Sequence, residues 1–265
     1  MPIYNHECYI PLDAKTIVWR YLDFDKFKSL LETKSLFFCR ADKFSDPFEG
    51  SIPRQEAEYR INTYKHLSQS FEHGYDEQQA LKNISGMQAT HQKYKKGIVV
   101  NCWHINKSES DAMWRLYLKS NEGVAIQSTK ELIETTMANA VEEISLSKVR
   151  YLDYDKDFWH HKVDFPVTNY NLITPFVHKR TEFTHEQEFR MFMRIQEAIR
   201  DEKYWDNEAI EKGKLVKIDL LTLIENVYFP PTIDEKTKNR IISLSEKLGF
   251  KFNYLESKLS SKPYY

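Results

Sequence analysis

Charged side chains alternate with mainly apolar ones in the stretch His185-Glu186-Gln187-Glu188-Phe189-Arg190-Met191-Phe192-Met193. Read as a β-strand, the stretch places Glu186, Glu188 and Arg190 on one face and mainly apolar residues on the other, because successive side chains point to opposite faces. The apolar face indicates packing on a core. We therefore predict a strand over 186–194 whose charged face is either a site or a solvated ladder of charges.

Further strands are predicted at 16–22, 35–40, 97–104, 123–127, 143–151, 215–220, 225–229 and 250–255, where β-branched and aromatic residues gather. Helices are predicted at 25–32, 110–119 and 234–248, with Asp23 or Asp25 capping the first. The polar segment 54–96 predicts two or three helices with a break near Gly86. We expect one α+β domain over 1–265, with a mixed, mostly antiparallel (split) β-sheet core, peripheral helices and a helical insertion at about 54–96.

The composition excludes several classes of protein. The 265 residues are 41% hydrophobic and 29% charged, and a formal charge of −1 gives no global attraction to nucleic acid or to an acidic membrane. No Gly-rich phosphate loop occurs, and the spacing of cysteines and histidines fits neither a disulfide framework nor a zinc site, so we expect no bound metal. No run is apolar enough to cross a bilayer and no secretion signal is seen, which predicts a cytoplasmic protein without membrane contact.

Polar side chains on other predicted strands are candidates for the same site. Arg20 emerges from the apolar first strand, and a guanidinium either pairs with a carboxylate or grips a phosphate through two hydrogen bonds. His104 ends the strand 97–104 and is suited to hydrogen-bond a ribose or a diphosphate. The basic pair Lys179-Arg180 lies just before the acidic strand and is placed to neutralise it.

Five short motifs, in this order, resemble a widespread bacterial family known as domain of unknown function 2971. They are Trp19-Arg20-Tyr21, Ser45-Asp46-Pro47-Phe48-Glu49, Asn101-Cys102-Trp103, Met113-Trp114 with Tyr117 and Gly123, and Glu186-Gln187-Glu188-Phe189-Arg190. The resemblance spans about residues 16–194. The chain departs from the family's pattern at His104, where a serine is usual. Membership of this family by itself implies no particular reaction.

The chain is also similar in layout to ADP-ribosyltransferases of the arginine-serine-glutamate type, which carry an arginine on the first strand, a polar residue on a middle strand and a late Glu-x-Glu strand. This resemblance implies NAD as the substrate and Arg20 as the residue that holds its phosphates. It places His104 in the serine position. Glu188 would bind the nicotinamide-ribose hydroxyls and stabilise an oxocarbenium-like state, and Glu186 would orient the acceptor.

The same resemblance implies further contacts to NAD. Such a reaction requires a carboxylate beside developing positive charge and aromatic walls for nicotinamide. Tyr21 and Trp103 are candidates for those walls, and Arg190 for a cofactor contact. The partners would be a nucleotide and a macromolecular acceptor, either protein or nucleic acid, as suits a bacterial toxin or a phage-defence effector.

Two other functions remain open from the sequence. One is an Mg²⁺-dependent nuclease or phosphohydrolase, with Arg20 and Arg190 on phosphates and the metal held by Asp46, Glu49, Glu186 and Glu188. The other is a non-catalytic module that binds a nucleotide or a protein. The transferase hypothesis requires Arg20, His104 and Glu188 to line one cleft, and we expect the helical insertion to border it.

Overall fold

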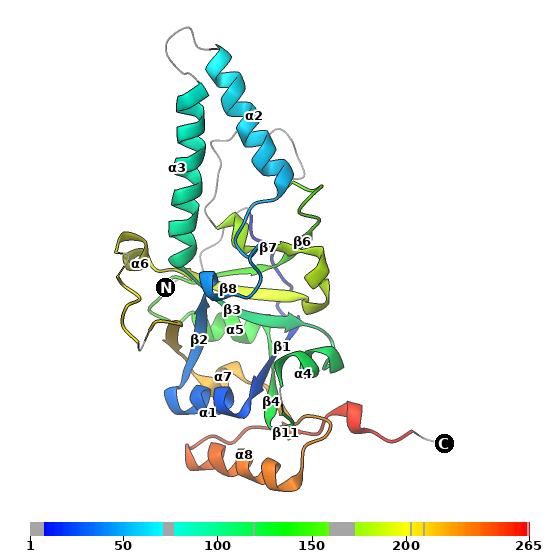
Figure 1. Cartoon of the computed structure of the whole chain (residues 1–265). Coiled ribbons are helices and arrows are strands. Elements are labelled where there is room, and N and C mark those ends of the chain that lie inside the picture. The colour runs from blue at the N-terminus through cyan, green and yellow to red at the C-terminus, as the bar shows by residue number, and fades with distance from the viewer. Residues whose placement is uncertain are drawn as a thin grey trace.

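The computed structural model describes residues 8–70, 77–118, 120–158, 173–201, 203–208, 210–263 and 265. It has the α+β fold expected from the sequence, with helices around a mixed, mostly antiparallel sheet (Figure 1). The nine strands of this sheet are β1 (Ile17–Asp23), β2 (Ser35–Arg40), β3 (Ile98–Ile105), β4 (Gly123–Thr129), β5 (Ser145–Lys148), β8 (Glu188–Arg194), β9 (Gly213–Lys217), β10 (Asn226–Tyr228) and β11 (Tyr254–Leu255). A second, two-stranded parallel sheet pairs β6 (Arg150–Leu152) with β7 (His178–Arg180).

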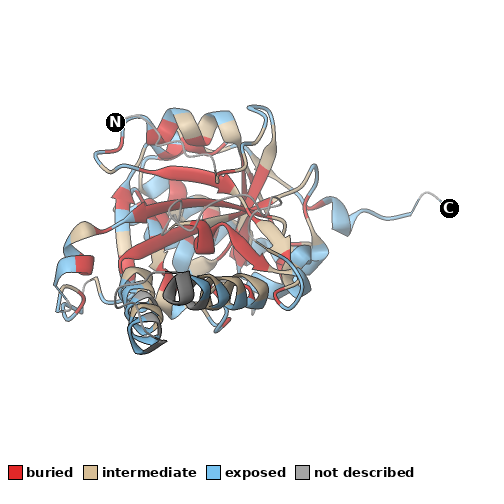
Figure 2. Ribbon diagram, turned by 90° about the horizontal axis from the view of Figure 1, so that it is seen from above, coloured by how far each residue is buried: buried red, intermediate tan, exposed pale blue. Residues whose placement is uncertain are grey.

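The helices are α1 (Phe24–Thr33), α2 (Arg54–Ser70), α3 (Glu77–Lys96), α4 (Asp111–Tyr117), α5 (Lys130–Met137), α6 (Gln196–Arg200), α7 (Leu220–Leu223) and α8 (Glu235–Lys247). Short 3₁₀ turns lie at Ala41–Lys43, Thr174–Phe176, Thr181–Glu186 and Lys258–Ser260. Buried residues concentrate in the strands, and the helices turn exposed faces outward (Figure 2). No helix in the described part of the chain is long and apolar enough to span a bilayer.

The sheet is split along one edge of β3. On one side, β3 pairs with β8 over the whole register from Ile98 to His104. On the other side, β2 pairs only at Val99 and Val100, and β1 pairs only at His104 and Ile105. Both neighbours run antiparallel to β3, so they diverge from it at opposite ends of the same edge. The backbone of β3 between these two contacts is therefore open to side chains, which must satisfy its polar groups.

The first strand-helix-strand unit forms as the sequence predicts. Asp23 caps α1, because its side chain accepts a hydrogen bond of 2.8 Å from the backbone N–H of Lys26. Three apolar residues of α1 are buried against the sheet, and Lys34 ends the helix in the left-handed region at φ 49°. The chain then turns directly into β2. This unit places β1 and β2, the two strands on either side of the split.

The helical insertion lies between β2 and β3 in sequence and consists of α2 and α3, which rise side by side away from the sheet (Figure 1). The predicted helix break near Gly86 is wrong. Gly86 lies inside α3, and a Cβ at this position would meet nothing within 4 Å. A glycine in a helix costs only about 1 kcal/mol relative to alanine, and the helix formers around it outweigh that cost. Residues 71–76, which connect the two helices in sequence, lie outside the described residues.

The acidic stretch differs from the prediction at its start. Residues 181–186 form a 3₁₀ turn, Gln187 adopts the left-handed region at φ 39°, and β8 begins at Glu188. The alternation that puts Glu186 on the same strand face as Glu188 is therefore wrong, although the carboxyl groups still meet. The strand predicted at 143–151 is also divided. It forms β5 in the main sheet and β6 beside β7, because the backbone N–H of Val149 turns to the carbonyl of Glu188.

The last third of the chain forms the predicted crossover. Asp234 caps α8 through the backbone N–H of Thr237, and β10 and β11 pair in parallel. The two strands extend the sheet beyond β4. The main apolar core lies between the sheet and helices α1, α5, α7 and α8, whereas α4 covers Trp19 and Tyr21 on another face.

Candidate functional site

A cavity of about 220 Å³ lies at the split between β1 and β2. Six of the seven predicted site residues line it, namely Arg20, Tyr21, Trp103, His104, Glu186 and Glu188. The expectation that Arg20, His104 and Glu188 line one cleft is therefore confirmed. The segments that carry these three side chains are separated by more than eighty residues at each step, so the arrangement comes from the pairing of β1 and β8 with β3.

Arg20 lies across the open edge of β3. Its Nη1 donates a hydrogen bond of 2.8 Å to the carbonyl oxygen of Cys102, which lies in the part of β3 between the β1 and β2 contacts. No carboxylate in the described part of the chain forms an ion pair with this guanidinium. Burial lowers the pKa of Arg20, but an arginine stays charged at any physiological pH. A desolvated cation without a counter-ion in a cavity is a site for an anion.

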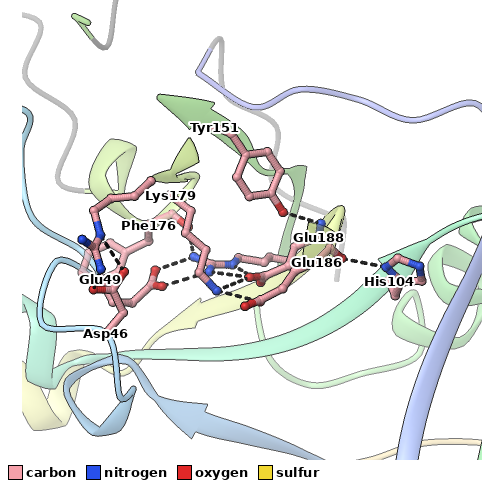
Figure 3. Close-up of polar contacts among 10 residues, drawn as sticks. Asp46, Glu49, His104, Tyr151, Phe176, Lys179, Glu186 and Glu188 are labelled. Atoms are coloured by element: carbon pink, nitrogen blue, oxygen red, sulfur yellow. Dashed lines mark hydrogen bonds and ion pairs between the residues drawn. The ribbon is translucent and has the colours of Figure 1, made fainter. Parts of the chain in front are cut away.

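The acidic end of the cavity contains Glu186 and Glu188, joined by Lys179 (Figure 3). The ammonium group of Lys179 donates to Glu186 Oε2 and to Glu188 Oε1, each at 2.7 Å. Lys179 comes from β7, one of two strands in the small parallel sheet. The prediction that the basic pair Lys179-Arg180 neutralises the acidic stretch is confirmed for Lys179, and Arg180 instead pairs with Asp46 at 2.9 Å.

Arg190 does not have the cofactor-binding role expected from the sequence. All five of its N–H groups are engaged inside the protein. Nε and Nη2 donate to Glu188, while Nη1 and Nη2 donate to Glu49, and Nη1 also donates to the carbonyl of Phe176. Only 1% of its side chain is exposed. Arg190 therefore anchors Glu188 from behind and has no donor left for a phosphate.

The two carboxyl groups titrate differently because their surroundings differ. Burial raises the pKa of Glu186 to about 7, and a hydrogen bond to the ionised Glu188 supports the protonated form. Burial would also raise the pKa of Glu188, but the charges of Arg190 and Lys179 outweigh it and hold that pKa well below the ordinary range. Below about pH 7 the pair therefore holds one proton, located on Glu186, and Lys179 and Arg190 balance the ionised Glu188.

His104 hydrogen-bonds the backbone at the acidic end of the cavity. Its Nδ1 lies 2.7 Å from the carbonyl oxygen of Glu186, and since a carbonyl only accepts, Nδ1 carries the proton. Burial lowers the pKa of His104, so the ring is neutral at pH 7. Nε2 is then an acceptor, and it is buried with no hydrogen-bond partner among the described residues. A ligand hydroxyl could donate to it, which is compatible with the ribose role expected from the sequence.

Aromatic rings form the walls of the cavity. Tyr21 is buried, and its hydroxyl accepts a hydrogen bond of 2.8 Å from the backbone N–H of Ser110. Trp103 is 1% exposed and donates through Nε1 to Asn101, so it supports the cavity from behind. Tyr117 stacks on Tyr21 with centroids 6.5 Å apart and remains 39% exposed. Of these three rings, Tyr117 is the one available to stack on a planar ligand.

A second cavity of about 290 Å³ adjoins the first and shares Phe44, Cys102, Tyr117, Glu186 and Glu188 with it. Its lining also includes Lys179, Asp46 and Glu49. Together the two cavities give the acidic pair two open sides. Neither is lined by a residue of α2 or α3, so the expectation that the helical insertion borders this cleft is wrong for both cavities.

The carboxylates considered for Mg²⁺ are already paired with cations. Asp46 pairs with Arg180, Glu49 with Arg190, and the two glutamates of the acidic pair with Lys179. Within the described ranges, no group of three or more acidic, histidine or cysteine side chains is placed to hold a metal ion. A metal would have to displace several ion pairs to bind here, which weakens the basis of the nuclease hypothesis.

Phe176 and Tyr151 were not recognised as site residues from the sequence, and Glu49 was considered only as a ligand for Mg²⁺, not as the partner of Arg190. Glu49 and Phe176 hold Arg190, and the hydroxyl of Tyr151 accepts a hydrogen bond of 2.8 Å from the backbone N–H of Glu188. Glu49 lies 141 positions from Arg190, so no local pattern could pair them. The only signal for Glu49 was its position in the turn shared with Asp46, and nothing marked Tyr151.

Comparison with known proteins links part of this site to a described family. No curated protein and no solved structure matches the chain. Residues 113–191 match the model of a family described as a protein of unknown function, DUF2971. This segment includes Glu186, Glu188 and Arg190, whereas Arg20 and His104 lie outside it. The chain is therefore similar to the DUF2971 family over the segment that supplies the acidic half of the cavity.

Proposed function

We propose that the protein is an ADP-ribosyltransferase-like enzyme that uses NAD, with the cavity at the split in the sheet as its active site. The observation that supports this most is the Arg20 guanidinium, which has no ion pair to any described carboxylate and lies in the same cavity as the Glu186–Glu188 pair. A diphosphate would supply the missing counter-charge of Arg20 through two hydrogen bonds. The ribose would then lie toward His104, with nicotinamide against the exposed ring of Tyr117.

The proposed chemistry follows from these positions. The bond between ribose C1′ and the pyridinium nitrogen breaks, and the nitrogen keeps the electron pair, so nicotinamide leaves as a neutral molecule. Positive charge develops on the ribose and is stabilised by the ionised Glu188. An acceptor that Glu186 orients forms a new bond to C1′ and releases a proton. The acceptor would be a protein or a nucleic acid, as in a toxin or a phage-defence effector.

A second candidate is a module that binds a nucleotide without reacting with it. One observation favours this candidate. Both oxygens of Glu188 accept hydrogen bonds from cations, Oε1 from Lys179 and Oε2 from Arg190. A carboxylate whose charge is balanced in this way stabilises a developing cation less than a free one does. The cavity would then recognise the phosphate through Arg20 and the ribose through His104.

Two measurements on the purified protein distinguish these proposals: NAD binding by calorimetry and release of nicotinamide by chromatography. Arg20→Lys should weaken NAD binding at least about tenfold, because a point charge cannot replace the planar fork. Glu188→Gln should lower nicotinamide release by roughly 10²–10³ while NAD still binds. The matched controls are Arg115→Lys and Glu182→Gln, at exposed positions outside the cavity.

Binding of NAD without release of nicotinamide would support the non-catalytic module. Wild-type protein that neither binds nor cleaves NAD would refute the enzyme, and absence of binding to ADP and ATP as well would refute the nucleotide-binding module. Circular dichroism of each variant excludes loss of the fold as the cause of lost binding.

A further inference from the structure

A third cavity, of about 580 Å³, lies at the base of the α2–α3 pair and is separate from the site described above. Its wall comes from the loop 47–52, which follows the first 3₁₀ turn, and from the facing sides of α2 and α3. The residues that line it are Pro47, Gly50, Ser51, Ile52, Ala57, Arg60, Ile61, Ile84, Ser85, Gln88, Ala89, His91, Gln92 and Lys95. Its volume is in the range of small-molecule sites.

The described side chains that line this cavity are aliphatic, neutral polar or basic. Aliphatic groups from the loop and both helices form one part, and among the described residues no aspartate, glutamate, phenylalanine, tyrosine or tryptophan lines it. The basic groups are Arg60, His91 and Lys95. Arg60 is neutralised by Glu56 at 2.8 Å, and burial lowers the pKa of His91, while Lys95 forms no ion pair within the described residues. Lys95 is therefore the cation that remains to be balanced.

A second polar group in the wall lacks a partner. The hydroxyl of Ser51 is buried and makes no hydrogen bond to any described residue. A buried hydroxyl without a partner is unfavourable, so a ligand acceptor near Ser51 would be stabilised by its hydrogen bond. The side chains of Gln88 and Gln92 add further donors to the same wall.

We propose that this cavity binds a small molecule with an anionic head and an aliphatic body. The head would lie against Lys95 and the polar wall, and the body against Ile52, Ile61 and Ile84. Among the described residues the ring in the wall is that of His91, which already stacks on Phe176, and this disfavours an aromatic base and hence a nucleotide here. This inference is independent of the function proposed for the other cavity, because no residue is shared between the two linings.

The position of the cavity gives it a structural connection to the acidic pair. A ring nitrogen of His91 hydrogen-bonds the carbonyl of Gly50, and the ring stacks on Phe176 with centroids 6.3 Å apart. Phe176 accepts a hydrogen bond from Arg190, and Glu49, next to Gly50, accepts two more. A molecule in the cavity would contact the loop that holds Arg190 in place.

The test titrates octanoate into the full chain and measures binding by calorimetry. Acetate, which has only the anionic head, and 1-octanol, which has only the aliphatic body and no charge, are titrated in the same way. We expect saturable binding of octanoate, and at least about tenfold weaker binding of either fragment. Ala89→Trp should abolish octanoate binding by filling the cavity. Lys95→Met should weaken it roughly fivefold to tenfold, whereas Lys93→Met, at an exposed position of the same helix, should leave it unchanged.

Absence of saturable octanoate binding would overturn the proposal, as would equal effects of Lys95→Met and Lys93→Met. Ala89→Trp is checked by circular dichroism, and if it does not fold, the two lysine variants decide the outcome. The readout contains no NAD, so failure here leaves the proposed function untouched, and failure of NAD binding leaves this proposal untouched.

Discussion

Replacing Glu186 by glutamine should change how the stability of the protein depends on pH. The protonated carboxyl group of Glu186 hydrogen-bonds Glu188, and burial together with this bond raises its pKa to about 7 from an ordinary value of 4.5. A glutamine keeps the size of the group and a donor toward Glu188, so Glu186→Gln mimics the protonated form at every pH. The difference in free energy of unfolding between wild type and variant therefore isolates the titration of this one group.

The sign follows from proton linkage. Because the folded-state pKa is raised, the contribution of Glu186 is fully present below the ordinary pKa and is lost as the pH rises through about 7. Between these limits the folded protein holds a proton that the unfolded chain has released. The stability of wild type relative to Glu186→Gln should thus fall as the pH rises from 4.5 to about 7, and stay constant on either side of that interval.

The magnitude can be worked out from the same interval. At about 1.4 kcal/mol for each pH unit, the pKa change from 4.5 to about 7 corresponds to about 3 kcal/mol. Glu186 retains partial contact with solvent, which screens its interactions, so we expect a measured fall of about 1–2 kcal/mol. The lowered pKa values of His104 and His91 act in the opposite direction below pH 6.5, but both proteins contain these histidines and their effect cancels in the difference.

The assay is denaturant unfolding followed by tryptophan fluorescence, at closely spaced pH values between 4 and 8. Equal denaturant slopes for the two proteins show that the comparison is valid. The control is Glu182→Gln, at an exposed position of the same 3₁₀ turn, which should give no pH-dependent difference from wild type. A difference for Glu186→Gln that stays flat across the interval, or that rises with pH, would refute the description of a shared proton.

Four further changes test other parts of the structure by denaturant unfolding. Arg190→Met should destabilise the protein by about 3–5 kcal/mol, because it removes the cation that pairs with the buried Glu49 and one of the two cations that pair with Glu188; a loss below about 1 kcal/mol would contradict the buried network. Gly50→Ala should destabilise by more than about 1 kcal/mol, since φ is +69° and the new Cβ would meet Phe176 at 2.5 Å. Gly86→Ala, with open space around it, should instead stabilise the protein by up to about 1 kcal/mol, and equal signs for the two glycines would contradict the local geometry. Asp234→Ala should cost about 1 kcal/mol by removing the cap of α8, whereas the unchanged stability of such a variant would show that the cap contributes nothing.

The sequence alone determined most strands and helix starts, because those depend on neighbouring residues. Alternation marked β8, and β-branched and aromatic residues marked β1, β2 and β3. The cap of α1 was narrowed to Asp23 or Asp25, and a helix was predicted to begin at Asp234, where the structure shows the cap of α8. Two predictions from local sequence were wrong, namely the start of β8 and the helix break near Gly86. The left-handed Gln187 moved the start of β8, and Gly86 was tolerated inside α3.

Only the tertiary structure decided which charged groups are paired and which are free. Arg20 and Arg190 look alike as strand arginines. Among the described residues, however, Arg20 hydrogen-bonds a carbonyl 82 positions away and forms no ion pair, whereas Arg190 pairs with Glu49 across 141 positions. Such ion pairs depend on how β1, β2 and β8 pair with β3, and no local sequence pattern predicts that arrangement. Electrostatic energy depends on distance in space and on burial, and for that reason the free cation at the split in the sheet could be identified only in the folded chain.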